Sequence, residues 1–277
     1  MSILKVPILF QKSVDNNRLH IKAYHGEKFN PPFVENWLTE ALIVSTARVV
    51  RPRMVIRHSS ETALLFIKAT PRNTLSGMPA PFLWQFSNTE AFWQMFSSYL
   101  SKCKSEQQFE ILELTQGFCE LCLASKGTLQ GFLISISLYI EFCVNQIFSS
   151  KNCGEQFKKN VDNLIEFVGT WECDSDIRIR AQKILTMLNN PSINERLNVL
   201  IDKAVIDNIH KKIWNKARPF LAHGNVIDFK KEDEFWQYRN YLIPMVYRLM
   251  FRIIGYKGIV LDYDGRQFRH VDYKWVD

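Results

Sequence analysis

The sequence has no hydrophobic run long enough to cross a membrane. Its longest apolar stretch, residues 131–144, contains Glu141 and falls short of the roughly 20 residues that a transmembrane helix needs. The first ten residues also lack the small-residue cleavage site and the extended apolar centre of a signal peptide. These two absences predict a cytoplasmic protein with no membrane partner.

The six cysteines show no paired spacing, so the sequence gives no sign of a secreted disulfide framework. Cys119 and Cys122 form a single C-x-x-C pair, without a second pair and without a histidine nearby. A zinc site therefore lacks ligands, and we expect reduced thiols that pack within a helix. The sequence predicts no metal and no other cofactor.

The chain does have a large apolar fraction and a positive charge. Of its 277 residues 47% are hydrophobic and 13% aromatic, which is enough for a dense core. The formal net charge is +7 and the pI is near 9.0. A basic balance favours a polyanionic partner, with nucleic acid first among them. An interpretation as a DNA-binding regulator rests on charge alone, because no helix-turn-helix spacing stands out.

Strand patterns dominate the first 70 residues. Alternating or β-branched residues predict strands over 4–10, 19–24, 47–57 and 63–69. Residues 36–44 follow the Pro31-Pro32 breaker and predict one helix. Three prolines and a glycine predict a loop over 71–81. We therefore expect a small mixed α/β module over residues 1–80.

Helical periodicity dominates the rest of the chain. Apolar residues three and four apart predict helices over 89–102, 109–125, 129–148, 156–168, 176–188, 195–216 and 235–254. Pro244 lies inside the last of these, so that helix is expected to start late or to kink near Tyr241. Asp264-Gly265 predicts a two-residue turn in a hairpin over 259–275. The expected fold class is α+β, with connecting helices at 81–127 and a mainly helical domain with a terminal hairpin at 128–277.

One segment carries a chemically competent pair, Arg218 and His223, between two helical runs. Three other pairs have a similar spacing but sit in strand-like or turn-like sequence: Arg18 with His25, and Arg51 and Arg53 with His58. Histidine can give or take a proton near neutral pH, and arginine presents a permanently charged fork to phosphate. Such a pair can cut RNA without a metal. A base removes the 2′-hydroxyl proton, the oxygen attacks the adjacent phosphorus, and the cation stabilises the charge that develops.

The segment resembles the signature of HEPN domains, helical-bundle ribonucleases and nucleotide-binding modules. In that signature an arginine is followed after four to six residues by histidine, and commonly then by glycine, here Gly224. Residues 131–148, with Leu138 and Glu141, and the close YLIPMVYRLMFRIIGYKG look like the Apea-like HEPN branch, over roughly residues 128–260. Residues five apart on a regular helix point about 140° from each other, so one helix would hold the pair poorly. The resemblance implies a homodimer in which two Arg/His pairs line one cleft.

The resemblance also implies a metal-independent endoribonuclease, acting in bacterial phage defence or as a toxin, with RNA as substrate and a regulatory or antitoxin protein as a further partner. His223 would be the general acid or base, and Arg218 would stabilise the phosphorane. The further RNA contacts predicted from charge and position are Lys212, Lys216, Asn225, Arg248 and Arg252. Pro219 replaces the family's polar residue and predicts a helix break, with Arg218 ending one helix and Pro219 starting the next. A catalytically silent HEPN module that binds nucleotide or a partner protein is the alternative.

Several of these residues have a second interpretation. Arg218 can instead pair with a helix end, and His223 can be hydrogen-bonded within a turn that follows the helix. Arg248 and Arg252, four residues apart, can line an RNA groove or stay in water. Glu141 can orient a basic group in the cleft or be a structural carboxylate. The tryptophans expected in the core or at a domain interface are Trp37, Trp84, Trp93 and Trp171.

Overall fold

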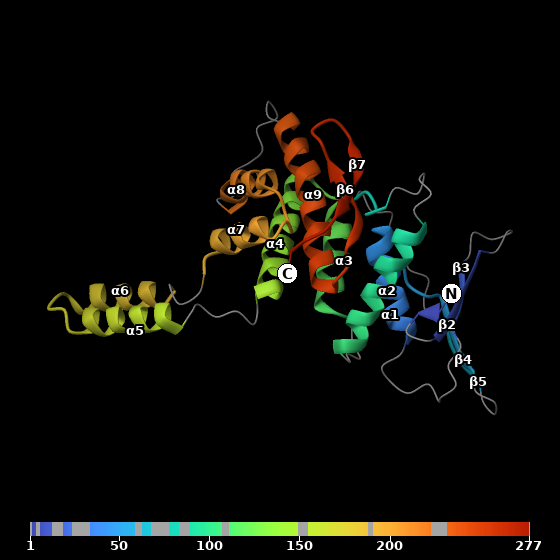
Figure 1. The fold of residues 1–277 in the computed structure, drawn as a ribbon, viewed down its shortest axis with the longest axis horizontal. Helices are drawn as coiled ribbons and strands as arrows, with labels where there is room; N and C mark the ends of the chain where they lie inside the picture. Colours follow the sequence, from blue (N-terminus) through green and yellow to red (C-terminus); the bar gives the residue numbers. More distant parts are fainter. Residues whose placement is uncertain are drawn as a thin grey trace.

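The computed structural model describes residues 2–3, 6–12, 19–23, 34–58, 63–67, 78–82, 89–106, 111–148, 155–187, 191–222 and 232–276. Across these ranges the chain has the predicted α+β fold, with short antiparallel strands at both ends and helices between them (Figure 1). The small mixed module comes first, the helical part follows, and a β-hairpin closes the chain. The predicted fold class is therefore confirmed.

The N-terminal strands form two antiparallel sheets. β1 (Ser2–Ile3), β2 (Val6–Lys12) and β3 (Leu19–Ala23) make one, and β4 (Met54–His58) and β5 (Ala63–Ile67) make the other. Between them lies α1 (Val34–Thr46). The prediction of a strand from residue 47 is wrong, because Ala47 takes a left-handed backbone (φ 51°) that ends α1 and the strand begins only at Met54. The predicted loop lies mostly outside the described residues.

Four helices make the centre of the molecule: α2 (Thr89–Glu106), α3 (Glu113–Ala124), α4 (Leu129–Phe148) and α9 (Glu232–Ile254). α4 has the predicted bounds, whereas α3 begins four residues later than predicted, after the extended Leu112. α9 is one helix that includes Pro244, and it does not start late. Residues 242–251 of this helix are almost wholly buried, and that packing offsets the backbone hydrogen bond that the proline cannot make.

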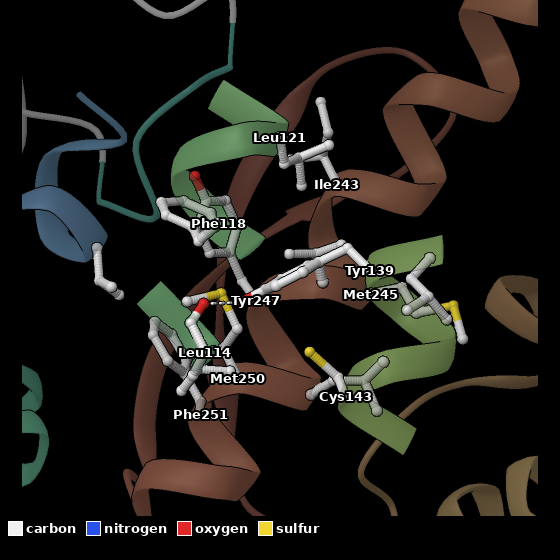
Figure 2. Packing of buried hydrophobic residues seen from close by; sticks show 14 of the residues in the cluster. Leu114, Phe118, Leu121, Tyr139, Cys143, Ile243, Met245, Tyr247, Met250 and Phe251 are labelled. Atoms are coloured by element: carbon white, nitrogen blue, oxygen red, sulfur yellow. Dashed lines mark hydrogen bonds between the residues drawn. The ribbon is translucent and has the colours of Figure 1, made fainter. Parts of the chain in front are cut away.

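On α3, α4 and α9 the core combines aliphatic side chains with aromatic and sulfur-bearing ones (Figure 2). The Tyr139 hydroxyl donates to the Leu114 carbonyl oxygen at 2.7 Å, which ties α4 to α3. The ring of Phe118 lies 6.0 Å from that of Tyr247 on α9. One continuous cluster reaches from Trp37 on α1 to Trp275 after the last strand, so α1 packs into the same core as the helical part.

α4 is long and apolar enough, by length and composition alone, to cross a membrane, with a mean hydropathy of 1.5. It is longer than the apolar stretch recognised in the sequence, because polar residues at both ends continue the helix. Inside the fold, one face of α4 packs against α9 and α3, and its buried residues belong to the core cluster. This is how a central helix of a globular bundle is packed.

α5 (Glu155–Gly169) and α6 (Ser175–Met187) form a hairpin that projects away from the bundle (Figure 1). The two helices pack against each other, and none of their described residues belongs to the core cluster. The Asp174 carboxylate accepts the Asp176 amide N–H at 2.8 Å at the start of α6. Trp171, at the tip, is 52% exposed, so its predicted place in the core is wrong.

Two helices replace the single helix predicted over 195–216. α7 (Ile193–Asp202) begins with a capping box of Ser192 and Glu195, and α8 (Asn208–Ala222) follows a short break. Ala204 adopts φ 55° there, and the Val205 amide N–H donates to the Leu200 carbonyl at 2.8 Å, as in a Schellman helix end. The predicted break at Arg218 is wrong, because the α8 backbone stays helical through Pro219.

Ala204→Gly should stabilise the protein. A side chain at φ 55° costs on the order of 1 kcal/mol that glycine does not pay, although glycine gains freedom in the unfolded chain. We expect the free energy of unfolding to rise by about 0.5 to 1 kcal/mol in urea denaturation. Ala217→Gly, in the middle of α8, is the matched control and should lower it. A loss of stability in Ala204→Gly would contradict the geometry of this helix end.

The terminal hairpin pairs β6 (Gly258–Tyr263) with β7 (Phe268–Tyr273). The Asp264 amide N–H donates to the Gln267 carbonyl oxygen at 3.3 Å, so the two central residues of the turn are Gly265 and Arg266, one position later than the predicted Asp264-Gly265. Gly265 takes the positive φ of 92°, whereas the Asp264 carboxylate accepts the amide N–H groups of Arg266 and Gln267 at 2.9 and 3.0 Å. The aspartate therefore acts as an acceptor in this turn and does not take the left-handed backbone.

Candidate functional site

Arg218 projects from the last turns of α8 and is held by two contacts. Its Nε donates to Glu141 Oε1 on α4 at 2.6 Å, and its guanidinium carbon lies 5.1 Å from the ring centroid of Trp214. The arginine side chain is 46% exposed and the Glu141 side chain 29%. Glu141 thus pairs with a basic group, a contact that fits both of the roles considered for it. Nε is engaged, so the two terminal guanidinium nitrogens can face a ligand.

Lysines extend this positive surface along α8. A hollow of about 520 Å³ is lined by Asn208, Lys211, Lys212, Asn215 and Lys216. Lys212 and Lys216 are exposed, and Lys211 is tied to the Asn198 side chain on α7. Positions 211, 215 and 218 share one side of a helix, so Arg218 lies on the side of α8 where Lys211 and Asn215 border the hollow, although it does not line the hollow itself. Lys211 was not predicted, because its role depends on the break that brings α7 alongside α8.

An apolar strip on α4 lies beside the Arg218–Glu141 pair. Ile134, Leu138 and Glu141 are spaced by four and three residues, which places them on one side of the helix. Leu138 is 62% exposed and Ile134 36%, although both are large and apolar. An exposed apolar strip next to a charged pair is typical of a surface that another chain covers.

His223 and Asn225 lie outside the described residues, as does Gly224. The structure therefore places one member of the predicted catalytic pair and not the other. α8 is helical up to Ala222, so its described end leads directly into the histidine.

Arg248 is not available for RNA. It is 7% exposed, and its guanidinium is bound by Asp207 Oδ2 at 2.9 Å and Asp262 Oδ2 at 3.1 Å. The Tyr273 hydroxyl donates to the Arg248 carbonyl at 2.8 Å. Arg248 joins the start of α8 to α9 and the terminal hairpin. Its role is therefore structural, and the prediction that it contacts RNA is wrong.

Arg252 lies elsewhere on α9, with its guanidinium carbon 5.2 Å from the ring centroid of Trp275. It borders a second hollow of about 420 Å³ whose other charged residues are Lys102, Glu106 and Glu113. The residues that line this hollow differ from those along α8. Acidic and basic groups alternate in it, which suits a polyanion poorly.

His210, which the sequence did not mark, completes the cluster around Arg248. Its Nδ1 accepts the Asp207 amide N–H at 3.1 Å, which gives the ring the part that glutamate plays in a capping box. Its Nε2 lies 3.8 Å from Asp262 Oδ1. Burial, together with the Arg248 charge, lowers the pKa of His210 to about 3. The spacing of Asp207 and His210 before a helical run was the signal that could have indicated it.

Acid should destabilise the fold through His210. Its pKa is near 6.5 unfolded and about 3 folded, so the neutral ring contributes full stability above pH 6.5 and loses it as the pH falls toward 3. The slope from this one proton is about 1.4 kcal/mol per pH unit. In urea unfolding at pH 7.5, 6 and 5, His210→Gln should show a shallower decline than the wild-type chain. Equal slopes in the two proteins would rule out this role.

The C-x-x-C pair lies on α3, where Cys122 is buried and its Sγ donates to the Ala47 carbonyl at 3.6 Å. Burial raises the pKa of Cys119 to about 11. In the ranges that the structure describes, no three His, Cys, Asp or Glu side chains are grouped as metal ligands would be.

Of the predicted site residues, the structure brings Lys212 and Lys216 onto the same helix as Arg218 and separates Arg248 and Arg252 from them. It adds Trp214, whose indole supports the arginine, and Lys211. No family model, no curated protein and no solved structure matches this chain.

Proposed function

We propose that this protein is a metal-independent endoribonuclease of HEPN type, with Arg218 and His223 as its catalytic residues. The observation that carries the proposal is the placement of Arg218. Its guanidinium is held by Glu141 and Trp214, its side chain remains 46% exposed, and it lies on the same side of α8 as Lys211 and Asn215, which border a lysine-lined hollow. A pre-positioned guanidinium near further positive charge suits the stabilisation of a phosphorane.

The chemistry needs one proton acceptor and one proton donor. His223 takes the proton of the ribose 2′-hydroxyl, the 2′-oxygen bonds to the adjacent phosphorus, and the bond from phosphorus to the 5′-oxygen breaks. The departing 5′-oxygen takes a proton from a histidine in the acid form. The products are a 2′,3′-cyclic phosphate and a 5′-hydroxyl, and no metal or water enters this step. Lys212 and Lys216 hold the flanking backbone.

A second copy of the chain supplies the other half of this site. Arg218 and His223 are five positions apart, and a single helix directs such residues about 140° from each other. The exposed strip of Ile134 and Leu138 beside Glu141 offers a surface through which a twofold partner can bring its own pair to the same cleft. The cytoplasm, phage defence or toxin action, and a regulatory or antitoxin partner belong to the same proposal.

Two observations favour the alternative, a catalytically silent module that binds nucleotide or a partner protein. Glu141 neutralises part of the Arg218 charge, and Pro219 stands where HEPN nucleases have a polar residue. A guanidinium so paired can still bind a phosphate through its terminal nitrogens without assisting cleavage.

RNA digestion in EDTA tests the proposal. The purified wild-type chain should cut single-stranded RNA in excess EDTA and leave 2′,3′-cyclic phosphate ends. The double variant Arg218→Ala/His223→Ala should leave the RNA intact. Uncut RNA with the wild-type chain, or equal cutting by the double variant, overturns the nuclease. A dimer that binds RNA and never cuts it supports the silent module.

A further inference from the structure

The α5–α6 hairpin exposes an apolar face that the chain itself does not cover. Phe167 is 69% exposed, Ile184 63%, Ile177 55% and Leu164 43%. Among the described hydrophobic residues of the two helices, only Val161 is buried. The hairpin therefore presents several large apolar side chains to water, which single surface residues do not explain.

These residues lie on one side of the hairpin. The helices meet along half-buried positions that include Ile165 and Val168 on α5 and Leu185 on α6, and the Gln182 side chain donates to the Ile165 carbonyl at 3.4 Å. Leu164 and Phe167 immediately precede the contact positions Ile165 and Val168. Successive residues on a helix are rotated by about 100°, so Leu164 and Phe167 point to one side of the contact between the two helices.

Ile177 and Ile184 come just before the α6 contact positions Arg178 and Leu185 in the same way. α5 and α6 run in opposite directions. For this reason the residue that precedes a contact position points to the same face of the hairpin on both helices. The four apolar side chains thus form one face. Asp162 and Glu166 follow contact positions and turn to the opposite side, and so does Ile179.

Two helices alone bury too little to be stable in water. The described residues of α5 and α6 are outside the core cluster, so the bundle does not supply the missing surface. The hairpin nevertheless has well-formed internal contacts, including the Asp174 cap and the packing along Val161. A further layer of helices against the apolar face would complete it.

We propose that this layer is the same hairpin of a second copy of the chain, so that two hairpins stack face to face as a four-helix bundle. Large apolar side chains have on the order of 200 Å² of surface, so the four residues with Trp171 at the tip offer roughly 600 Å² per copy. With the neighbouring backbone and side-chain stems this approaches the ~800 Å² per partner of a specific interface. A twofold contact of this kind is self-complementary by construction.

The chemistry of the face selects against other partners. Among the described residues of the hairpin, only Arg180 brings a positive charge to the side of Ile177 and Ile184, whereas a nucleic acid needs several lysines or arginines. A membrane-bound helix pair would carry several basic residues beside its apolar face, whereas among the described residues of the hairpin only Arg180 stands on the side of Ile177 and Ile184. A second apolar hairpin matches the face best. The inference does not rest on RNA cleavage.

Sedimentation equilibrium of the full chain tests this contact. The wild-type chain should be dimeric at micromolar concentration. Phe167→Asp/Ile184→Asp should raise the dissociation constant on the order of a hundredfold or more, since each carboxylate would be buried without a partner. Ile179→Asp, on the opposite side of the same hairpin, is the matched control and should sediment like the wild-type chain. Circular dichroism at equal concentration reports whether each variant keeps its helices.

Three results would overturn the hairpin contact. One is a wild-type monomer over the whole concentration range, and another is an equal effect of Ile179→Asp and of the double variant. The third is a dimer that survives Phe167→Asp/Ile184→Asp and is lost in Leu138→Asp, on the α4 strip. The third result would be consistent with the dimer proposed for the nuclease. If instead the hairpin dimer forms but RNA is not cut, then only the nuclease proposal is wrong.

Discussion

Arg248→Ala should lower the free energy of unfolding by about 3 to 5 kcal/mol. The guanidinium is 7% exposed and forms ion pairs with Asp207 and Asp262. Asp262 is itself nearly buried, so removal of the cation leaves a carboxylate in the core without its partner. The cost arises chiefly from that stranded charge and less from the lost attraction.

Urea denaturation at pH 7.5 measures this loss, and Arg252→Ala is the matched control. Arg252 is one turn away on the same helix and is only half-buried, so its removal should cost less than about 1 kcal/mol. Arg248→Ala/Asp262→Asn should recover part of the stability, because the charge that was stranded is also gone. If Arg248→Ala unfolds like the wild-type chain and loses RNA binding, then the arginine is an RNA contact and the structural role is wrong.

Arg248 and Arg252 also show where sequence reasoning reaches its limit. Helical periodicity correctly places both on α9, since a stretch of apolar residues three and four apart defines that helix. It does not say that a loop residue, Asp207, and a strand residue, Asp262, come to meet the first arginine and not the second. Partners distant in the chain decide whether a charge is buried, and one sequence contains no record of them.

The bounds of the helices also divide into those that the sequence predicts and those that depend on tertiary packing. α4 could be predicted to the residue because its apolar pattern is continuous and ends in polar sequence. The break between α7 and α8 could not, because Ala204 is a strong helix former that takes a left-handed backbone only when packing demands it. Pro219 and Pro244 predicted breaks or kinks, yet both α8 and α9 continue through their prolines. At Pro244 the buried packing of α9 outweighs the local cost of the proline.

In the candidate site, the sequence indicated Arg218 and left two roles open for Glu141, as a group that orients a base or as a structural carboxylate, and the structure pairs the two residues. Trp214 was not predicted, because a tryptophan four residues before an arginine in an amphipathic helix is ordinarily a core residue. It is one here as well, fully buried, and its ring face also supports the guanidinium. A residue that serves the core and the site together leaves no separate signal in the sequence.

Arg218→Ala should reduce the rate of RNA cleavage by a factor of about 10² to 10³, as the loss of one pre-positioned donor does in comparable oxyanion sites. The substitution should leave the fold intact, because the arginine side chain is 46% exposed. Initial rates on a fluorescent RNA in EDTA, with unfolding measured in parallel, separate the two effects. Arg266→Ala, an exposed arginine in the terminal hairpin, removes the same charge far along the chain and should cleave at the wild-type rate.

Two further variants decide whether the geometry of Arg218 matters or only its charge. Arg218→Lys keeps the charge but loses the fork that binds Glu141 through Nε while its other nitrogens face phosphate, so it should recover only a small part of the rate. Glu141→Gln keeps an oxygen acceptor for Nε and weakens the hold on the guanidinium, so kcat should fall more than KM rises. If Arg218→Lys cleaves like the wild-type chain, then the site needs a positive charge near the RNA and nothing more, and the pairing with Glu141 is structural. If instead both variants lose rate while RNA binding is unchanged, then the fixed guanidinium acts on the transition state, which is what its placement between Glu141 and Trp214 predicts.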